Sequence, residues 1–330
     1  MNLQFLTHDL SNPTILFFLL GILAVIIKSD LEIPESSFKF ISLYLLFSIG
    51  FRGGQELQHS PWTAEIGWSL VFGMTIAALI PLYSFFIIKK RIGISNAAAV
   101  AAAYGSVSAV TFVAALSFLE IKGLALNGHM VAVMAFMEFP AIIVGVSLLK
   151  IYDNAGANMG FRELLRHSLA NGSVLMIMGS LVIGLLSDSK QAADIAPFTT
   201  DIFKGFLALF LLEMGMTTAR RIKSFKTHGW YMALFAIVIP AINGIIVAWL
   251  SQFVTSDPSN RFIFAVLAAS ASYIAAPAAV RMAMPEANEG LYLTTAISIT
   301  LPFNIIIGIP AYFAVSAMIG GWPTMASLLP

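Results

Sequence analysis

The 330-residue chain contains no cysteine and few charged residues. Without cysteine, disulfides, thiolate catalysis and zinc or iron–sulfur sites built on cysteine are excluded. Charged residues make up only 11% of the chain and hydrophobic residues 58%, which is more apolar surface than a soluble core of this length needs. The sequence therefore predicts an integral membrane protein in which little length remains for a soluble domain.

Basic residues near the N-terminus and templates of enzyme chemistry are missing as well. No Lys or Arg precedes Lys28, so the first apolar run lacks the basic segment of a cleavable signal peptide and is expected to stay as a helix. The chain has no histidine pair at metal-binding spacing and no Gly-x-Ser-x-Gly elbow, and "GFRGG" (50–54) lacks the Lys of a phosphate loop. We do not expect an enzyme.

Apolar windows long enough to cross a membrane follow one another along the chain. One crossing takes about 20 apolar residues, because the hydrocarbon core is about 30 Å thick. Ten spans are predicted, at 13–27, 38–51, 66–88, 94–119, 128–151, 169–186, 203–216, 229–253, 262–284 and 290–319. If the N-terminus is outside, 13 of the 18 Lys and Arg residues are cytoplasmic, most densely in "KKR" (89–91) and "RRIKSFK" (220–226). The positive-inside rule then predicts that both termini are external.

The two halves of the chain resemble each other. Four pairs of segments align in the same order: 21–30 with 179–188, 38–51 with 203–216, 105–115 with 268–279, and 138–143 with 302–307. Because each half holds five spans, an odd number, the second half must cross the membrane in the opposite sense. The sequence thus predicts an all-α membrane protein with ten transmembrane helices in two inverted five-helix repeats, in which 38–51 and 203–216 are unusually short spans.

Spans four and nine carry matching small polar residues, and both are expected to be broken near the middle of the membrane. The alignment pairs Ser106 with Ser270 and Ser108 with Ser272. Unwound backbone at that depth is tolerated where it lines a polar cavity, and paired interruptions in inverted repeats mark binding sites. The alternative is that these small residues only allow close helix packing.

A broken helix offers free amide groups and the positive end of its dipole. If the two breaks cross, the amides and hydroxyls of the first segment would converge on the same small oxyanion as those of the second. The predicted anion-binding residues are Gly105, Ser106, Val107 and Ser108 in the first break and Ala271, Ser272 and Tyr273 in the second.

Glu138 lies well inside the fifth span, where a carboxylate costs at least about 2.5 kcal/mol unless it faces protein, water or a cation. The matching region of the second half contains Asn304, and carboxylate, amide and freed carbonyl oxygens are ligands that sodium prefers. The alternative is that Glu138 caps a broken helix or pairs with one buried donor. Glu213, seven residues before Arg220, is expected to be structural.

Three segments carry a resemblance to a known family. They are "YGSVSAVTFVAAL" (104–116), "AFMEFPAIIV" (135–144) and "SASYIAAPAAVRMAMPEANEGLYLTTAISITLPFNIIIGIP" (270–310), the last being the most specific. Over nearly its whole length the chain resembles the cyanobacterial sodium-dependent bicarbonate transporters and their relatives in other bacteria. The resemblance implies a homotrimer in the bacterial inner membrane that takes up bicarbonate together with sodium.

The resemblance also implies an organisation and a set of site residues. The repeats would be residues 1–151 and 169–330, joined by a cytoplasmic linker at 152–168, and each would contribute to a core domain and a gate domain. Bicarbonate would be held where the broken helices four and nine meet, by Ser106, Val107, Ser108, Ala271, Ser272 and Tyr273. Sodium, the coupling ion, would lie beside it, near Gly105, Thr111, Glu138 and Asn304. No organic cofactor is implied.

Two departures and several alternatives stay open. The cyanobacterial members have a longer segment between their halves and are regulated by a nucleotide-binding PII-like protein, so the short linker at 152–168 gives little support to such a partner. The second break has no carboxylate of its own, which leaves the identity of the small monoanion open. The alternatives are an organic-anion/sodium symporter related to bile-acid carriers, a sodium/proton antiporter in which Glu138 cycles its proton, and a passive anion channel.

Overall fold

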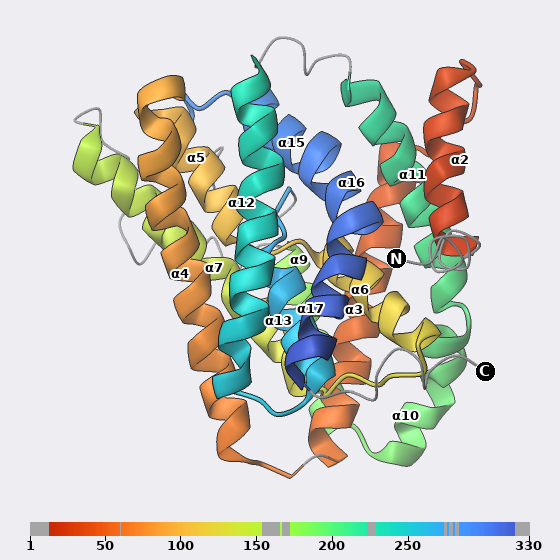
Figure 1. The fold of residues 1–330 in the computed structure, drawn as a ribbon. Helices are drawn as coiled ribbons and strands as arrows, with labels where there is room; N and C mark the ends of the chain where they lie inside the picture. Colours follow the sequence, from red (N-terminus) through yellow and green to blue (C-terminus); the bar gives the residue numbers. More distant parts are fainter. Residues whose placement is uncertain are drawn as a thin grey trace.

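The computed structural model describes residues 13–59, 61–153, 166, 172–222, 229–273, 276, 280 and 284–320. Within these residues all regular secondary structure is helical and no strand occurs (Figure 1). The predicted linker at 152–168 lies almost wholly outside the described residues. The predicted all-α class is confirmed for the part of the chain that is described.

The helices follow one another with short connections. In chain order they are α2 (Pro13–Ile26), α3 (Glu35–His59), α4 (Ala64–Ile92), α5 (Ile94–Gly105), α6 (Ala109–Ile121), α7 (His129–Tyr152), α9 (Gly172–Leu186), α10 (Ser189–Ala196), η1 (Pro197–Asp201), α11 (Phe203–Ile222), α12 (Gly229–Leu250), η3 (Ser251–Phe253), α13 (Pro258–Ala268), α15 (Glu289–Thr295), η4 (Ala296–Thr300), α16 (Leu301–Phe303), η5 (Asn304–Gly308) and α17 (Ile309–Gly320). Three of the short elements, η1, η4 and η5, are π-helical.

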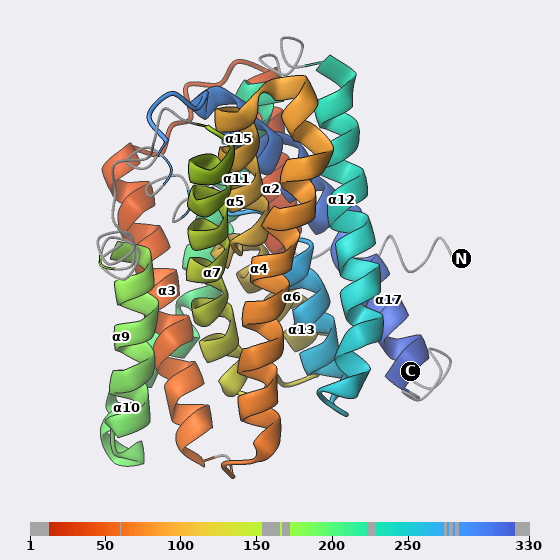
Figure 2. The same cartoon turned by 90° about the vertical axis from the view of Figure 1, so that its left-hand side faces the viewer.

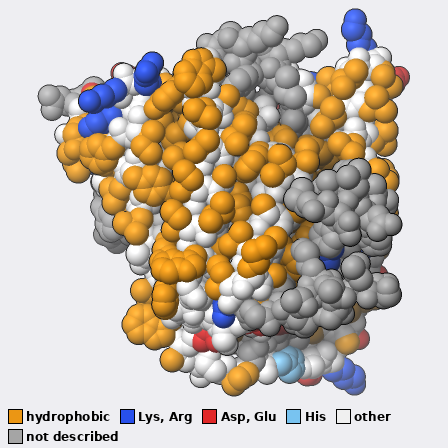
Figure 3. All heavy atoms as spheres, viewed as in Figure 1, with side chains coloured by type: hydrophobic (Ala, Val, Ile, Leu, Met, Phe, Trp, Pro, Cys, Tyr) orange, Lys and Arg blue, Asp and Glu red, His pale blue; other side chains and the backbone are white. Residues whose placement is uncertain are grey.

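Length and composition identify membrane-spanning segments. Among the described residues, six helical segments are long and apolar enough to cross a bilayer: Ala64–Ile92, Ile94–Leu119, His129–Tyr152, Ser189–Thr217, Gly229–Phe253 and Glu289–Ile319. Leu16–Ile26 and Leu175–Leu186 are shorter apolar helices. Figure 3 shows a broad apolar surface over α4 and α12, with charged side chains gathered toward its upper and lower margins. The chain is a multi-pass membrane protein, and the full count of ten spans remains a prediction.

The expectation of two unusually short spans was wrong as a statement about helix length. α3 has 25 residues and α11 has 20, because helical backbone continues past the apolar windows. In α3 the polar end is held by a neighbouring helix. The side-chain amide of Gln55 donates to the carbonyl oxygens of Gly184, in α9, and of Ser187, the latter at 2.9 Å. A polar turn with such partners can stay helical against another helix.

Four helices, which we call the paired helices, pack in two pairs: α3 with α9, and α2 with α11 (Figures 1 and 2). The pairs are exchanged, because each contains one helix from either half of the chain. Each pair joins the second helix of one half of the chain to the first helix of the other. Glycine allows the close approach in both. A Cβ atom added at Gly50 would lie 2.6 Å from the Ile177 carbonyl oxygen, and one added at Gly215 would lie 3.0 Å from the Phe18 carbonyl carbon. The aligned glycines thus make matching contacts.

Gly215→Val is expected to destabilise the protein, because its side chain would meet the backbone of α2, which cannot move aside as a side chain can. Overpacking of this kind costs about 1–3 kcal/mol and lowers Tm by several degrees. Thermal unfolding of the purified protein in detergent measures the effect. Gly205→Val on the same helix is the matched control, since an added Cβ there meets nothing within 4 Å. Equal Tm values for the two variants would contradict the assignment.

The remaining helices form a second group around the broken segments, which we call the central helices. α4, α5 and α7 pack on one another, α12, α13 and α17 do the same, and α6 packs on α13. The two groups meet where α3 crosses α7 and where α11 packs on η4. At the first crossing a Cβ added at Gly128 would lie 2.5 Å from the Gly53 carbonyl oxygen, so the backbones are nearly in contact.

Candidate functional site

The fourth predicted span is interrupted where its small polar residues stand. α5 ends at Gly105, Ser106 is extended (φ −81°, ψ 151°), and α6 begins at Ala109. The hydroxyl of Ser108 accepts a hydrogen bond from the Thr111 amide at 3.2 Å and so caps the first turn of α6. A Cβ added at Gly105 would lie 2.9 Å from the Ala141 side chain. Glycine therefore lets the end of α5 pack closely on α7.

The second break repeats this arrangement. α13 ends at Ala268, and the chain then runs without regular structure through Tyr273. The hydroxyl of Ser272 accepts a hydrogen bond from the Ala276 amide at 3.2 Å, as that of Ser108 does in the first break. The hydroxyls of the aligned serines therefore each accept a hydrogen bond from a backbone amide three or four residues further along the chain.

The two breaks face each other and are joined by hydrogen bonds. The Ser108 amide donates to the Ser270 hydroxyl at 2.9 Å, and the Ser272 amide donates to the Ala103 carbonyl at 2.7 Å. All four residues are buried. The structure therefore brings together the two segments that were predicted to bind an anion, including Val107 and Ala271, which are buried as well.

The serine hydroxyls of the first break do not converge as predicted. Ser106 donates to a carboxylate oxygen of Glu138 at 2.5 Å, whereas the Ser108 hydroxyl is turned to its own helix. The physical reason is that a buried carboxylate needs a hydrogen-bond donor, which Ser106 supplies to Glu138. The first turn of α6 needs an acceptor for its free amide groups, which Ser108 supplies. Tyr273 of the second break lies with its hydroxyl 3.6 Å from the Met214 sulfur, at the surface of α11.

The predicted sodium ligands divide between the two breaks. Glu138, on α7, is tied to the first break through Ser106, and Gly105 and Thr111 belong to the same break. Asn304 is tied to the second break, because its amide nitrogen donates to the Ala269 carbonyl at 2.7 Å. The described hydrogen bonds therefore connect Glu138 to the first break and Asn304 to the second.

Residues outside the predicted set hold the second break in place. Asn243 of α12 donates to the Ala268 carbonyl at 3.2 Å and accepts a hydrogen bond from Tyr83. The Tyr312 hydroxyl lies 3.2 Å from the amide oxygen of Asn304. A signal for Asn243 was present in the sequence, because it is a polar amide inside the apolar run "IVIPAINGIIVAWL".

The site offers amides, hydroxyls and one buried carboxylate, and it lies at the N-terminus of α6. A helix N-terminus and hydroxyl donors suit a small oxyanion, and oxygen ligands suit a hard cation such as sodium. Among the described residues no group of three or more His, Asp or Glu side chains could hold a metal ion. Glu213 accepts a hydrogen bond from Thr217 at 3.0 Å and lies 4.0 Å from Arg220.

Comparison with known proteins agrees with this chemistry. No curated protein matches the chain. Residues 13–317, nearly the whole chain, match the Na+-dependent bicarbonate transporter superfamily. That match makes the protein a transporter and not an enzyme, and it confirms the resemblance found in the sequence. The chain belongs to the Na+-dependent bicarbonate transporter superfamily.

Proposed function

We propose that this protein imports bicarbonate together with sodium by alternating access. The observation that carries the proposal is the pair of facing breaks, which are joined by the hydrogen bonds of Ser108 to Ser270 and of Ser272 to Ala103. Glu138 lies beside the first break, where it accepts a hydrogen bond from Ser106. Family membership supports sodium and bicarbonate as the transported ions. Binding between two broken helices lets both sides of the membrane reach one site in turn.

The anion site would lie between the breaks. Amide groups and hydroxyls of the first break, with the positive end of the α6 dipole, would hold the bicarbonate oxygens from one side. The second break would hold them from the other. The residues proposed for this role are Ser106, Val107, Ser108, Ala271, Ser272 and Tyr273. All are buried in the structure, so a bound anion would be shielded from water and these donors would act more strongly on it.

Sodium would bind on the α7 side of the first break, near Gly105, Thr111 and Glu138. Pro140 has no N–H, so the Phe136 carbonyl loses its usual helical donor and adds an oxygen close in sequence to Glu138. Asn304 would act from the second break, by ordering the end of α13. Coupling follows from charge, because a cation and an anion bound close together in a buried site stabilise each other.

The movement would take place between the two groups of helices. The paired helices would form the gate and the central helices the core, with each group drawing on the first repeat (1–151) and on the second (169–330). The exchanged pairing of α3 with α9 and of α2 with α11 supports an inverted repeat. The close crossing of Gly53 and Gly128 supports a contact that closes one side. We also propose a homotrimer in a bacterial inner membrane with both termini outside.

Uptake of labelled bicarbonate into proteoliposomes tests the proposal. We expect uptake when sodium is high outside and at least tenfold less when potassium replaces it. Uptake that does not depend on sodium would contradict symport and favour a passive anion channel. A proton flux driven by sodium without any anion would indicate an antiporter, and uptake of an organic anion in place of bicarbonate would indicate the bile-acid-carrier type.

A further inference from the structure

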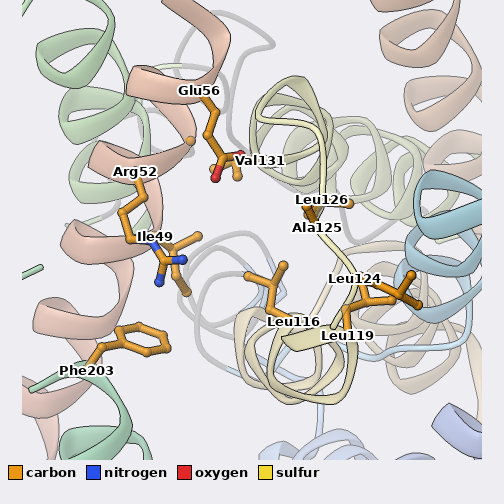
Figure 4. Close-up of a pocket in the computed structure, with 11 residues that line it drawn as sticks. Ile49, Arg52, Glu56, Leu116, Leu119, Leu124, Ala125, Leu126, Val131 and Phe203 are labelled. Carbon is orange, nitrogen blue, oxygen red and sulfur yellow. The ribbon is translucent and has the colours of Figure 1, made fainter. Parts of the chain in front are cut away.

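A cavity of about 220 Å³ lies between the paired helices and the central helices. Ile49, Arg52, Gly53 and Glu56 of α3 and Phe203 of α11 form one wall. The opposite wall consists of Leu116 and Leu119 of α6, the loop residues Leu124, Ala125 and Leu126, and Val131 of α7. Figure 4 shows the Arg52 side chain reaching from α3 toward the space between these walls. The cavity thus places a guanidinium group at the boundary between the proposed gate and core.

Arg52 and Glu56 are the charged side chains of this lining, and they lie at different depths. Glu56 is exposed to solvent, whereas Arg52, one turn further into the helix, is partly buried. The Arg52 guanidinium carbon lies 5.9 Å from the centre of the Phe203 ring, a cation–π distance that orients the group. Water screens the carboxylate more strongly than the guanidinium. The guanidinium has five N–H donors in a planar fork, so it can bind an anion while it keeps its contacts within the protein.

The same boundary continues from the cavity to the first break. A smaller hollow is lined by Ser42, Leu45 and Leu46 of α3, Ala109, Val110 and Val113 of α6, and Phe210 of α11. On α6 the lining residues of the two hollows follow one helical face from Ala109 to Leu119, and on α3 they follow one face from Ser42 to Glu56. Because Ala109 directly follows Ser108, this boundary leads from Arg52 to the proposed anion site.

We propose that the cavity is an external vestibule in which Arg52 binds the oxyanion before it reaches the broken helices. This proposal rests on the proposed function and on the outward orientation of this side of the protein. The ligand class is a small monovalent oxyanion, which the planar guanidinium can hold through two oxygens at once. The apolar hollow between the vestibule and the breaks is a narrow passage that opens when gate and core separate.

The absence of cysteine in the natural chain allows a direct test of the charge in the vestibule. Ala125→Cys puts one thiol on the exposed loop that lines the cavity. Its rates of modification by a negatively charged and by a positively charged, membrane-impermeant methanethiosulfonate reagent are measured in intact cells. We expect Arg52→Gln to lower the ratio of the two rates at least about fivefold, and we expect bicarbonate to slow the modification only when Arg52 is present.

Lys190→Gln in the same Ala125→Cys background is the matched control, because Lys190 is an exposed basic residue of α10 outside the cavity lining. Its rate ratio should stay within about twofold of the parent. A ratio that Arg52→Gln also leaves unchanged would overturn the vestibule. If the ratio falls but the wild-type protein takes up no bicarbonate with sodium, Arg52 still binds an anion in the vestibule and the proposed function is wrong.

Transport supplies the second readout. Arg52→Gln should raise the KM for external bicarbonate about tenfold and leave kcat within about twofold, because the vestibule acts before the central site. Arg52→Lys keeps the charge but loses the paired donors, so its KM should lie between those of the wild type and Arg52→Gln. A fall in kcat at unchanged KM would contradict the role of Arg52 in capturing the anion.

Discussion

Glu138→Gln is expected to raise the KM for sodium in bicarbonate uptake by about 10- to 150-fold. This range corresponds to the loss of about 1.5–3 kcal/mol for one interaction with a charged group. Glutamine keeps the shape of the side chain and can still accept the hydrogen bond from Ser106, so the fold should be retained. Initial rates of uptake into proteoliposomes, measured against sodium concentration at saturating bicarbonate, give the KM.

Glu213→Gln is the matched control for this experiment. Glu213 is also a buried carboxylate, but its described partners are Thr217 and Arg220 on its own helix. We expect its KM for sodium to stay within about twofold of the wild type, since no sodium contact is lost. An unchanged KM in Glu138→Gln, or equal increases in both variants, would contradict the assignment of Glu138 to sodium.

The break in the fourth span could be predicted from the sequence because its cause is local. Gly105, Ser106 and Ser108 are poor residues for the middle of a membrane helix, and a serine that can cap the next turn favours a helix start. The structure ends α5 and begins α6 at these residues. The matching serines at 270 and 272 predicted the second break by the same reasoning, and α13 ends just before them.

The length of α3 could not be predicted from its own sequence, because the groups that stabilise its polar end belong to a distant part of the chain. Arg52, Gln55 and Glu56 end the apolar window, and hydropathy therefore places the end of the span before them. Whether a polar turn stays helical depends on partners, and the partners of Gln55 are carbonyl groups of Gly184 and Ser187, more than 120 residues away in sequence. The same limit applies to Arg52, because the cavity that it lines is formed with residues of α6, α7 and α11.

The direction of the serine hydroxyls was also set by tertiary structure. Ser106 and Ser108 are equivalent in the sequence, yet one donates to Glu138 and the other caps α6. The placement of α7 beside α5 decides this, and packing of Gly105 against Ala141 brings the two helices together. The site is therefore more asymmetric than the repeat, with a carboxylate at the first break and Asn304 at the second.

Removing the hydroxyls of Ser108 and Ser272 should strongly weaken the binding of bicarbonate. In the structure the hydroxyls of Ser108 and Ser272 accept backbone amide bonds, so each still has its own O–H to donate to bicarbonate. Ser108→Ala and Ser272→Ala should therefore each raise the KM for bicarbonate about tenfold or more, as expected for a hydrogen bond to a charged group. The double variant should lose more than about a hundredfold if the two breaks act on the same anion from opposite sides. Uptake against bicarbonate concentration at saturating sodium measures these values.

Stability distinguishes binding from folding in these variants. Loss of a hydroxyl that accepts one backbone amide bond costs about 1 kcal/mol, so each single variant should still be purified as a folded protein with a slightly lower Tm. Ser316→Ala is the matched control, because Ser316 is fully buried and its hydroxyl has no described hydrogen-bond partner. If the Ser108 and Ser272 variants keep the wild-type KM, or if Ser316→Ala raises it equally, the anion does not bind between the breaks. We expect the KM for bicarbonate to rise in both single variants and the KM for sodium to change less. This result would locate the anion between the two breaks and sodium beside it, next to Glu138.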